Sequence, residues 1–91
     1  MGIIRVSSRS RTASVAGAIA GTYRDNGEAN VQAIGAGAVN QAVKAAAIAT
    51  DFLAEEGKIV VIVPSFVELD IQGRQRTAIH LCVQPRQADS D

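Results

Sequence analysis

Two segments with helical spacing, each placed between short β-type runs, constrain the fold of this chain more than any other feature of its sequence. The β-type runs are residues 3–6 ("IIRV"), 29–34 ("ANVQAI") and 59–63 ("IVVIV"), and the helical segments span roughly residues 14–26 and 37–55. A strand, a helix and a second parallel strand are joined by a right-handed crossover in nearly all known sheets. The first three strands are therefore expected to point in the same direction.

The last third of the chain predicts a β-hairpin whose first strand begins in the run 59–63. That run is continuous in β-branched residues, as expected of a strand buried on both faces of a sheet. Pro64 follows it and favours a bulge or a strand edge, because proline cannot donate a hydrogen bond to the ladder. Alternation resumes over residues 67–71, a turn lies around Gly73, and the final strand spans residues 77–84. The predicted element order is βαβαββ.

The ends of the first helix carry recognisable signals. Thr12 or Ser14 is expected to cap its start by accepting a hydrogen bond from a free backbone N–H group. Asn26 and Gly27 supply the left-handed residue that ends it.

The second helix follows Gly35-Ala36-Gly37 and consists almost entirely of small residues. A helix N-terminus offers free N–H groups and a partial positive charge, both suited to an anion. The glycines would let the backbone approach such a ligand without an intervening Cβ, and Asn40 and Lys44 share one helix face just inside. A tight packing joint explains the glycines equally well, because the GxG pattern lacks the remainder of a dinucleotide-binding or P-loop motif.

The composition of the 91 residues limits the classes of protein to which the chain can belong. The length suits one small domain, which we expect over residues 1–86 with a polar tail at 87–91. Cys82 is the only cysteine, so neither a disulfide nor a metal cluster is expected, and it should be a small buried residue. No apolar run approaches the ~20 residues of a membrane span. We expect a cytoplasmic protein without cofactor or metal.

Three connections follow the carboxyl ends of the predicted parallel strands and should meet at one edge of the sheet: residues 7–13, 35–37 and 70–76. We call this edge the cationic rim, because four arginines lie on it against two carboxylates, although the whole chain has no net charge. The opposite edge and the tail hold three basic and seven acidic side chains. The rim arginines are Arg9, Arg11, Arg74 and Arg76.

Four segments of the sequence resemble the stage V sporulation protein S family. They are "SVAGAIAG" (14–21), "QAIGAGAVNQAVKAAAIA" (32–49), "PSF" (64–66) and "TAIHL" (77–81), and the likeness extends from about residue 3 to residue 85. This family is similar to the Alba-type nucleic-acid-binding fold. The resemblance implies an α/β (α+β two-layer) domain with βαβαββ order, a mixed four-stranded sheet, two helices on one face and assembly into a homodimer or tetramer.

The resemblance also implies a function, that of a small bacterial regulator of sporulation, septation or developmental gene expression that binds DNA or RNA. By similarity to Alba proteins, the first loop would contact phosphates, the joint before the second helix would line the same surface, and the hairpin would act as an arm. Because "SSRSR" stands where Alba proteins carry a lysine-rich loop, we expect the binding to be weak. The candidate interface residues are Ser8, Arg9, Arg11, Gly35, Gly37, Asn40, Lys44, Arg74 and Arg76.

Three functions remain open on the sequence. The first is nucleic-acid binding through the cationic rim, by backbone and shape recognition, because no aromatic residue is interleaved with the arginines for base stacking. The second is an oligomeric protein-interaction module whose subunit interface is the alanine-rich second helix. The third is a small-anion or nucleotide sensor at the glycine joint. We expect no enzymatic activity, since no nucleophile or acid can be paired with His80 from its spacing.

Overall fold

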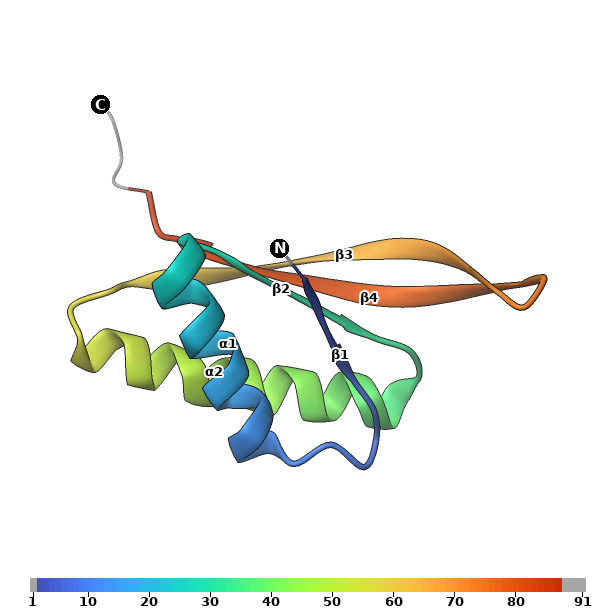
Figure 1. Ribbon diagram of the computed structural model, residues 1–91, viewed down its shortest axis with the longest axis horizontal. Coiled ribbons are helices and arrows are strands. Elements are labelled where there is room, and N and C mark those ends of the chain that lie inside the picture. Colours follow the sequence, from blue (N-terminus) through green and yellow to red (C-terminus); the bar gives the residue numbers. More distant parts are fainter. Residues whose placement is uncertain (1, 88–91) are drawn as a thin grey trace.

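The computed structural model describes residues 2–87 as a two-layer domain in which a four-stranded sheet carries two helices on one face (Figure 1). The predicted polar tail lies, apart from Gln87, outside the described residues. In chain order the elements are β1 (Ile3–Val6), α1 (Thr12–Asn26), β2 (Ala29–Ala33), α2 (Ala36–Glu55), β3 (Val60–Ile71) and β4 (Arg74–Pro85). The predicted fold class and element order are confirmed. Neither helix is long and apolar enough to cross a membrane, as judged over the described residues.

The strand order is β1-β2-β4-β3, so that β4 lies between the two strands that α2 connects. β1 pairs with β2 in parallel, and β4 runs antiparallel to both β2 and β3. The first three strands therefore point the same way, as predicted. Ala33, at the end of β2, is level with Ile79, which in turn pairs with Phe66. From Phe66 the hairpin continues to Ile71 as an arm, by roughly 3.3 Å per residue.

The prediction that the run 59–63 forms a strand buried on both faces was wrong. β3 is an edge strand, because its hairpin partner β4 occupies its inner side, and Val63 is 42% exposed. Its β-branched residues therefore line a half-open surface rather than a central strand. Pro64 fits this position, since a proline on an edge strand can turn its missing N–H away from the ladder. Pairing continues through Pro64, opposite Leu81, without the bulge considered as an alternative.

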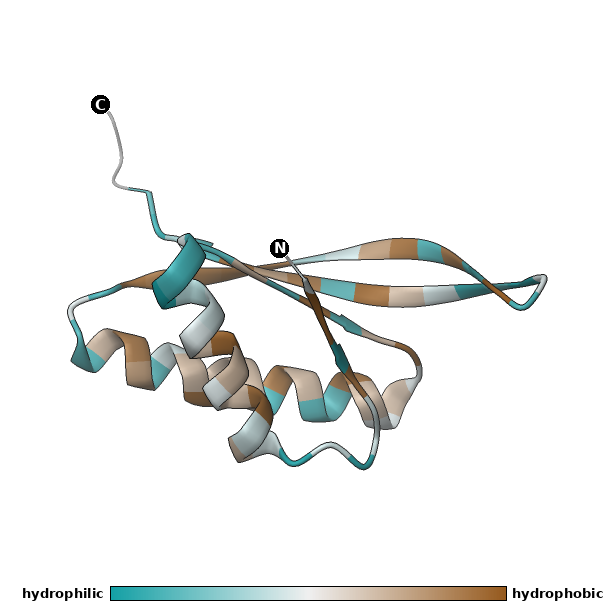
Figure 2. Cartoon of the chain, viewed as in Figure 1, coloured by the Kyte–Doolittle hydropathy of each residue, from teal (hydrophilic) through white to brown (hydrophobic). Residues whose placement is uncertain are grey.

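The core lies between the helices and the sheet and is built from buried side chains of both layers; Figure 2 shows hydrophobic residues along the helices and the strands. Small side chains let α2 approach α1 and the sheet closely, and Ile19, Val31 and Leu53 are fully buried between the helices and the sheet. Burial of such a side chain contributes about 1.5–3 kcal/mol. The alanine row of α2 thus packs inside the chain. Its buried members are Ala38, Ala42, Ala45, Ala46 and Ala49.

The predicted cap of α1 was also wrong. Arg11 occupies the N-cap position and no side chain caps the helix, while Thr12 is already its first residue. The hydroxyls of the preceding loop bond within the loop instead, as described below. The predicted end is confirmed: Gly27 adopts φ 78°, and its N–H donates to the Tyr23 carbonyl at 2.7 Å.

Candidate functional site

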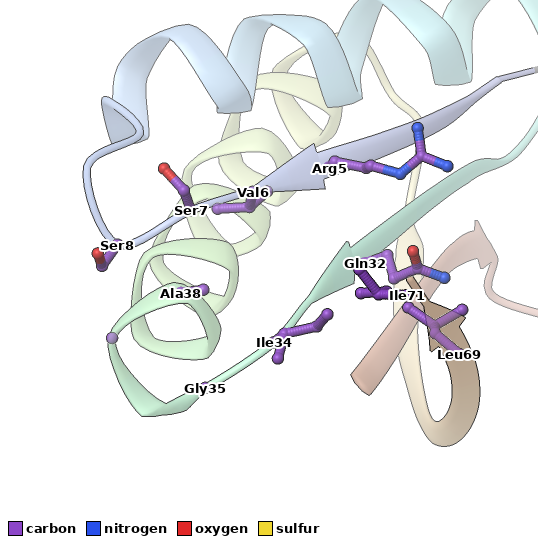
Figure 3. Close-up of a pocket in the computed structure, with 11 residues that line it drawn as sticks. Arg5, Val6, Ser7, Ser8, Gln32, Ile34, Gly35, Ala38, Leu69 and Ile71 are labelled. Atoms are coloured by element: carbon purple, nitrogen blue, oxygen red, sulfur yellow. The ribbon is translucent and has the colours of Figure 1, made fainter. Parts of the chain in front are cut away.

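The three predicted connections meet at one border of the molecule, where they surround a cavity of about 500 Å³ (Figure 3). Ser7 and Ser8 line it from the first loop, Gly35 and Gly37 from the start of α2, and the hairpin contributes the side chains named below. The convergence follows from the common direction of β1, β2 and β3. The geometric basis of the cationic rim is therefore present in the fold.

Leu69 and Ile71 form the wall of the cavity that the hairpin supplies, and Ile34 lies between them and the glycine joint (Figure 3). Two strand residues complete the polar part of the lining. Arg5 and Gln32 are partners in the β1–β2 register, so their side chains share the face of the sheet that the helices leave open. The cavity is therefore aliphatic on the hairpin side and polar along the sheet.

The first loop is held by hydrogen bonds among its own serines. The backbone N–H of Ser7 donates to Ser10 Oγ at 2.9 Å, and that of Arg9 donates to Ser7 Oγ at 3.2 Å. Gln41 of α2 secures the loop from outside by donating Nε2 to the Ser10 carbonyl at 2.8 Å. The hydroxyls of Ser7 and Ser10 are thus engaged within the loop, whereas Ser8, an exposed residue, has no such bond within residues 2–87.

Gly35 and Gly37, at the start of α2, are glycines for different physical reasons. Gly35 is the N-cap residue and adopts φ 91°, a conformation that side-chain-bearing residues rarely tolerate. Gly37 has ordinary helical geometry, but a Cβ there would lie 2.9 Å from Ser8 Cβ. Gly37 is therefore a packing joint between α2 and the first loop, as one of the two sequence interpretations held. Gly35, Gly37 and Ala38 nevertheless line the cavity, so this helix end borders it.

Asn40 and Lys44 are exposed on α2, one turn apart, but neither lines the cavity. They lie further along the helix than the residues that do. Arg9 and Arg11 are likewise exposed in and after the first loop and outside the cavity.

The hairpin separates its charges onto two faces. Arg74 pairs with Ile71 and Arg76 with Leu69, so both arginines share the face that borders the cavity. Asp70 and Glu68 alternate onto the opposite face, where Glu68 Oε2 accepts a hydrogen bond from Thr77 Oγ1 at 2.8 Å. At the tip, Arg74 and Arg76 line a second hollow of about 340 Å³. The carboxylates counted against these arginines in the sequence therefore do not face them.

Arg5 belongs with this surface, although the sequence interpretation left it unassigned. The alternation of "IIRV" was the signal that could have found it, since Ile4 and Val6 pack inwards and Arg5 must then point to the other face. Gln32 was also missed, although it alternates with the inward-facing Val31 and Ala33 of β2 and so belongs to the open face of the sheet. Its burial there, beside a cavity that the hairpin also lines, could not be read from the sequence.

Charges at the far end of the molecule are paired instead. Arg24 Nη2 lies 2.6 Å from Glu56 Oε2, and Lys58 Nζ lies 3.5 Å from Glu56 Oε1. The hydrogen bond from Arg24 lowers the pKa of the Glu56 carboxyl and, reciprocally, raises the pKa of the Arg24 guanidinium. Within residues 2–87 no ion pair involves an arginine of the rim or Arg5. The rim arginines are thus available to an outside anion.

The remaining polar side chains of the open sheet face form local contacts. His80 Nε2 lies 2.8 Å from Asn30 Oδ1. Cys82 is half-buried rather than buried as predicted, because the helices cover only the other face of β4, and burial raises the pKa of its thiol. No group of three His, Cys, Asp or Glu side chains in the described part of the chain is arranged to hold a metal ion.

Two comparisons with known proteins relate the chain to others. The family model of Stage V sporulation protein S (SpoVS) matches residues 2–86. The fold is similar to the solved structure of Alba from Thermoplasma volcanium, with a TM-score of 0.63 and 17% sequence identity. That similarity covers 91% of this chain and 99% of the Alba chain. At this identity the likeness to Alba concerns the fold alone.

Proposed function

Because the chain belongs to the stage V sporulation protein S family, we propose that it is a small cytoplasmic regulator that binds nucleic acid weakly through the cationic rim and catalyses no reaction. The observation that carries the proposal is the separation of charge on the hairpin. Arg74 and Arg76 face the border where the first loop and the start of α2 also lie, and Glu68 and Asp70 face away. A backbone phosphate approaching this border would meet arginines and no opposing carboxylate.

The chemistry of the rim suits phosphate rather than bases. Arginine presents a planar fork of donors that matches phosphate oxygens. Arg9 and Arg11 lie on a loop whose shape is already fixed by the serine hydrogen bonds, so little conformational entropy of the loop would be lost on binding. Phe66 is 77% exposed but alternates onto the hairpin face away from Arg74 and Arg76. Stacking of bases among the arginines is therefore not expected, and backbone and shape would be read instead.

The rim proposal predicts a salt-dependent affinity that the arginines control. We expect the logarithm of the binding constant to fall with the logarithm of salt concentration by about 0.9 per phosphate neutralised on duplex DNA. Arg9→Ala/Arg11→Ala/Arg74→Ala should weaken binding and flatten this slope. Fluorescence anisotropy with duplex DNA, duplex RNA and single strands, at about 50 and 200 mM salt, would measure both effects.

Arg86→Ala is the matched control for this experiment, because Arg86 is an exposed arginine beyond the end of β4, opposite the start of β3. It should leave affinity and slope close to those of the wild type. A triple variant that binds like the wild type would reject the rim, and equal losses in the triple variant and Arg86→Ala would show only a general charge effect.

An oligomeric protein-interaction module is the second candidate, favoured by exposed apolar side chains. Val43 of α2 is 51% exposed and Phe66 of β3 is 77% exposed. The alanines that the sequence favoured for a subunit interface are buried in the core of their own chain. A homodimer or tetramer would instead use the outer row of α2 and the free side of β3.

A further inference from the structure

Gln32 is the most deeply buried polar residue of the sheet, with 8% of its surface exposed, and its side chain lines the cavity (Figure 3). Its register partner on β4 is His80, which hydrogen-bonds to Asn30 instead. No side-chain bond within residues 2–87 uses the Gln32 amide. Yet none of the buried side-chain nitrogen or oxygen atoms described is both sealed from solvent and without a partner. Both amide atoms of Gln32 therefore keep some exposed surface, and the side chain that carries them lines the cavity.

The Gln32 amide has no hydrogen-bond partner within residues 2–87 and can be reached from the cavity, so its donor and acceptor are free to pair with a ligand. The site around it is also asymmetric. Leu69 and Ile71 lie beside Gln32, and the start of α2 with Gly35 and Ala38 lies at the other end (Figure 3). Among residues 2–87, no carboxylate lines the cavity, whereas Arg5 does. A ligand that matches this cavity would have two parts. One is flat or apolar and carries a hydrogen-bond donor and acceptor for the Gln32 amide, and the other is an anionic group that reaches the start of α2.

We propose that the cavity binds a single nucleotide, with the base between the aliphatic hairpin wall and Gln32 and the phosphate at the start of α2. A glutamine amide presents one donor and one acceptor side by side, which matches an edge such as N6 and N7 of adenine. The first turn of α2 offers free N–H groups to the phosphate, and Gly35, Gly37 and Ala38 of this helix start line the cavity. The volume of about 500 Å³ falls in the range of small-molecule sites.

The nucleotide has two sources, a free nucleotide or an unpaired nucleotide of a bound strand. Only the second source rests on the proposed function of the rim, since a free nucleotide could enter whether or not the rim binds a strand. Arg9, Arg11 and Arg74 do not line the cavity, so the two sites can be altered separately.

The test is a titration of the isotope-labelled protein, followed by the side-chain amide signals of glutamine in NMR spectra. AMP, GMP, CMP, UMP and inorganic phosphate would be added one by one, followed by a short unpaired strand and the same strand fully paired. We expect at least one mononucleotide or the unpaired strand to shift the Gln32 amide signals, and inorganic phosphate to leave them unchanged. Gln32→Leu, which preserves volume, should weaken that binding about tenfold or more.

Gln84→Leu is the matched control, because Gln84 lies on the same open face of the sheet outside the cavity and contacts Cys82. It should bind as the wild type does. Ile71→Asp is a second variant at a half-exposed position of the wall, where a carboxylate would replace the apolar surface against which the base packs, without disturbing the core. It should also weaken binding, so the test does not depend on the folding of Gln32→Leu.

Three results would overturn the inference: no ligand shifts the Gln32 signals, phosphate competes as well as the nucleotides do, or Gln32→Leu and Gln84→Leu bind alike. The rim triple variant distinguishes the two proposals. Mononucleotide binding that survives in it, with strand binding lost, supports both. Mononucleotide binding by a protein with no affinity for any strand supports the cavity alone, and salt-dependent strand binding without a response at Gln32 supports the rim alone.

Discussion

Single residues decide how the border of this molecule is assembled, and the glycines show it most directly. Eight glycines are spread along the chain, but they differ in what a Cβ would meet. At Gly37 it would press on Ser8, whereas at Gly17, inside α1, nothing lies within 4 Å. In the segment Gly35-Ala36-Gly37, glycine is therefore required at 35 by the backbone conformation and at 37 by the lack of space for a Cβ. The sequence alone could not separate these two reasons.

Replacing Gly37 with alanine should lower the free energy of unfolding by about 1–3 kcal/mol, the usual cost of inserting a methyl group into a tight contact. Gly17→Ala should instead raise it by about 0.5–1 kcal/mol, because an open helix position favours alanine over glycine. Urea unfolding of both variants would measure the difference. Gly37→Ala/Ser8→Gly tests the cause, since removal of the Ser8 Cβ should recover part of the loss; no recovery would contradict the contact.

Whether the sequence could identify a side chain of the site depended on where its neighbours in space lie along the chain: near neighbours could be predicted, and distant ones could not. Arg74 and Arg76 could be assigned to the rim because the turn at Gly73 is local. Gln32 could not, because its burial depends on a hairpin some forty positions later in the chain. Ser8 was predicted to contact phosphate from the first loop, and the hydroxyls of its neighbours Ser7 and Ser10 fix the shape of that loop.

At the scale of elements, the helices and the hairpin are fixed by different means. α1 and α2 pack through small residues, and their C-terminal ends are linked by the ion pair of Arg24 and Glu56. Among the described residues β3 pairs with one strand, β4, since it lies at the edge of the sheet, and its first residue, Val60, packs in the core. Pro64 and the turn at Gly73 restrict that edge, which reduces the chance that another strand pairs with it.

The ion pair predicts a specific dependence of stability on pH. The pKa of Glu56 is lower in the folded chain than its usual value, so its contribution is complete above the usual carboxyl pKa and is lost as the pH falls through the lowered value. Wild type should therefore melt at a higher temperature than Glu56→Gln near neutral pH, by a small margin because the pair is exposed. The two melting temperatures should converge in acid.

Thermal unfolding followed by circular dichroism between pH 7 and about pH 3 covers this window. Glu55→Gln is the matched control, an exposed neighbour with no ion pair among the described residues. A gap between wild type and Glu56→Gln that stays constant down to the lowest pH would show that the pair does not titrate as its pKa requires.

At the scale of the whole molecule, a chain without net charge folds so that the arginines of the cationic rim and the ion pairs of the described chain lie at opposite ends. Arginines without ion-pair partners in the described chain gather at the border of the first loop and the hairpin, and the ion pairs lie at the far end, where both helices finish. The hairpin arm extends past the helices (Figure 1). Phe66 at its base is 77% exposed, and Val63, which pairs with Cys82 on the open face of the sheet, is 42% exposed. Such exposed apolar side chains on a small domain are typical of an association surface.

We expect the purified chain to have two or four times the 9.5 kDa mass of one copy in light scattering. Phe66→Ser should shift it towards the monomer, because it removes the most exposed large apolar side chain. Asp51→Ser is the control, an exposed change on α2 that removes no apolar surface. A monomer in the wild type would exclude self-association through this surface. A pull-down that retains a protein partner but no nucleic acid would favour the interaction module over the rim.

The sequence by itself determined the order of the elements, the common direction of β1, β2 and β3, and hence the meeting of three connections at one border. These follow from local periodicity and from the right-handedness of crossovers, both of which act over short stretches. The tertiary structure decided that β4 lies between β2 and β3, that Arg5, Arg74 and Arg76 share a face while Glu68 and Asp70 leave it, and that Gln32 is buried beside a cavity. Those outcomes depend on which distant strands pair and in what register, because a shift of one residue turns every side chain to the other face.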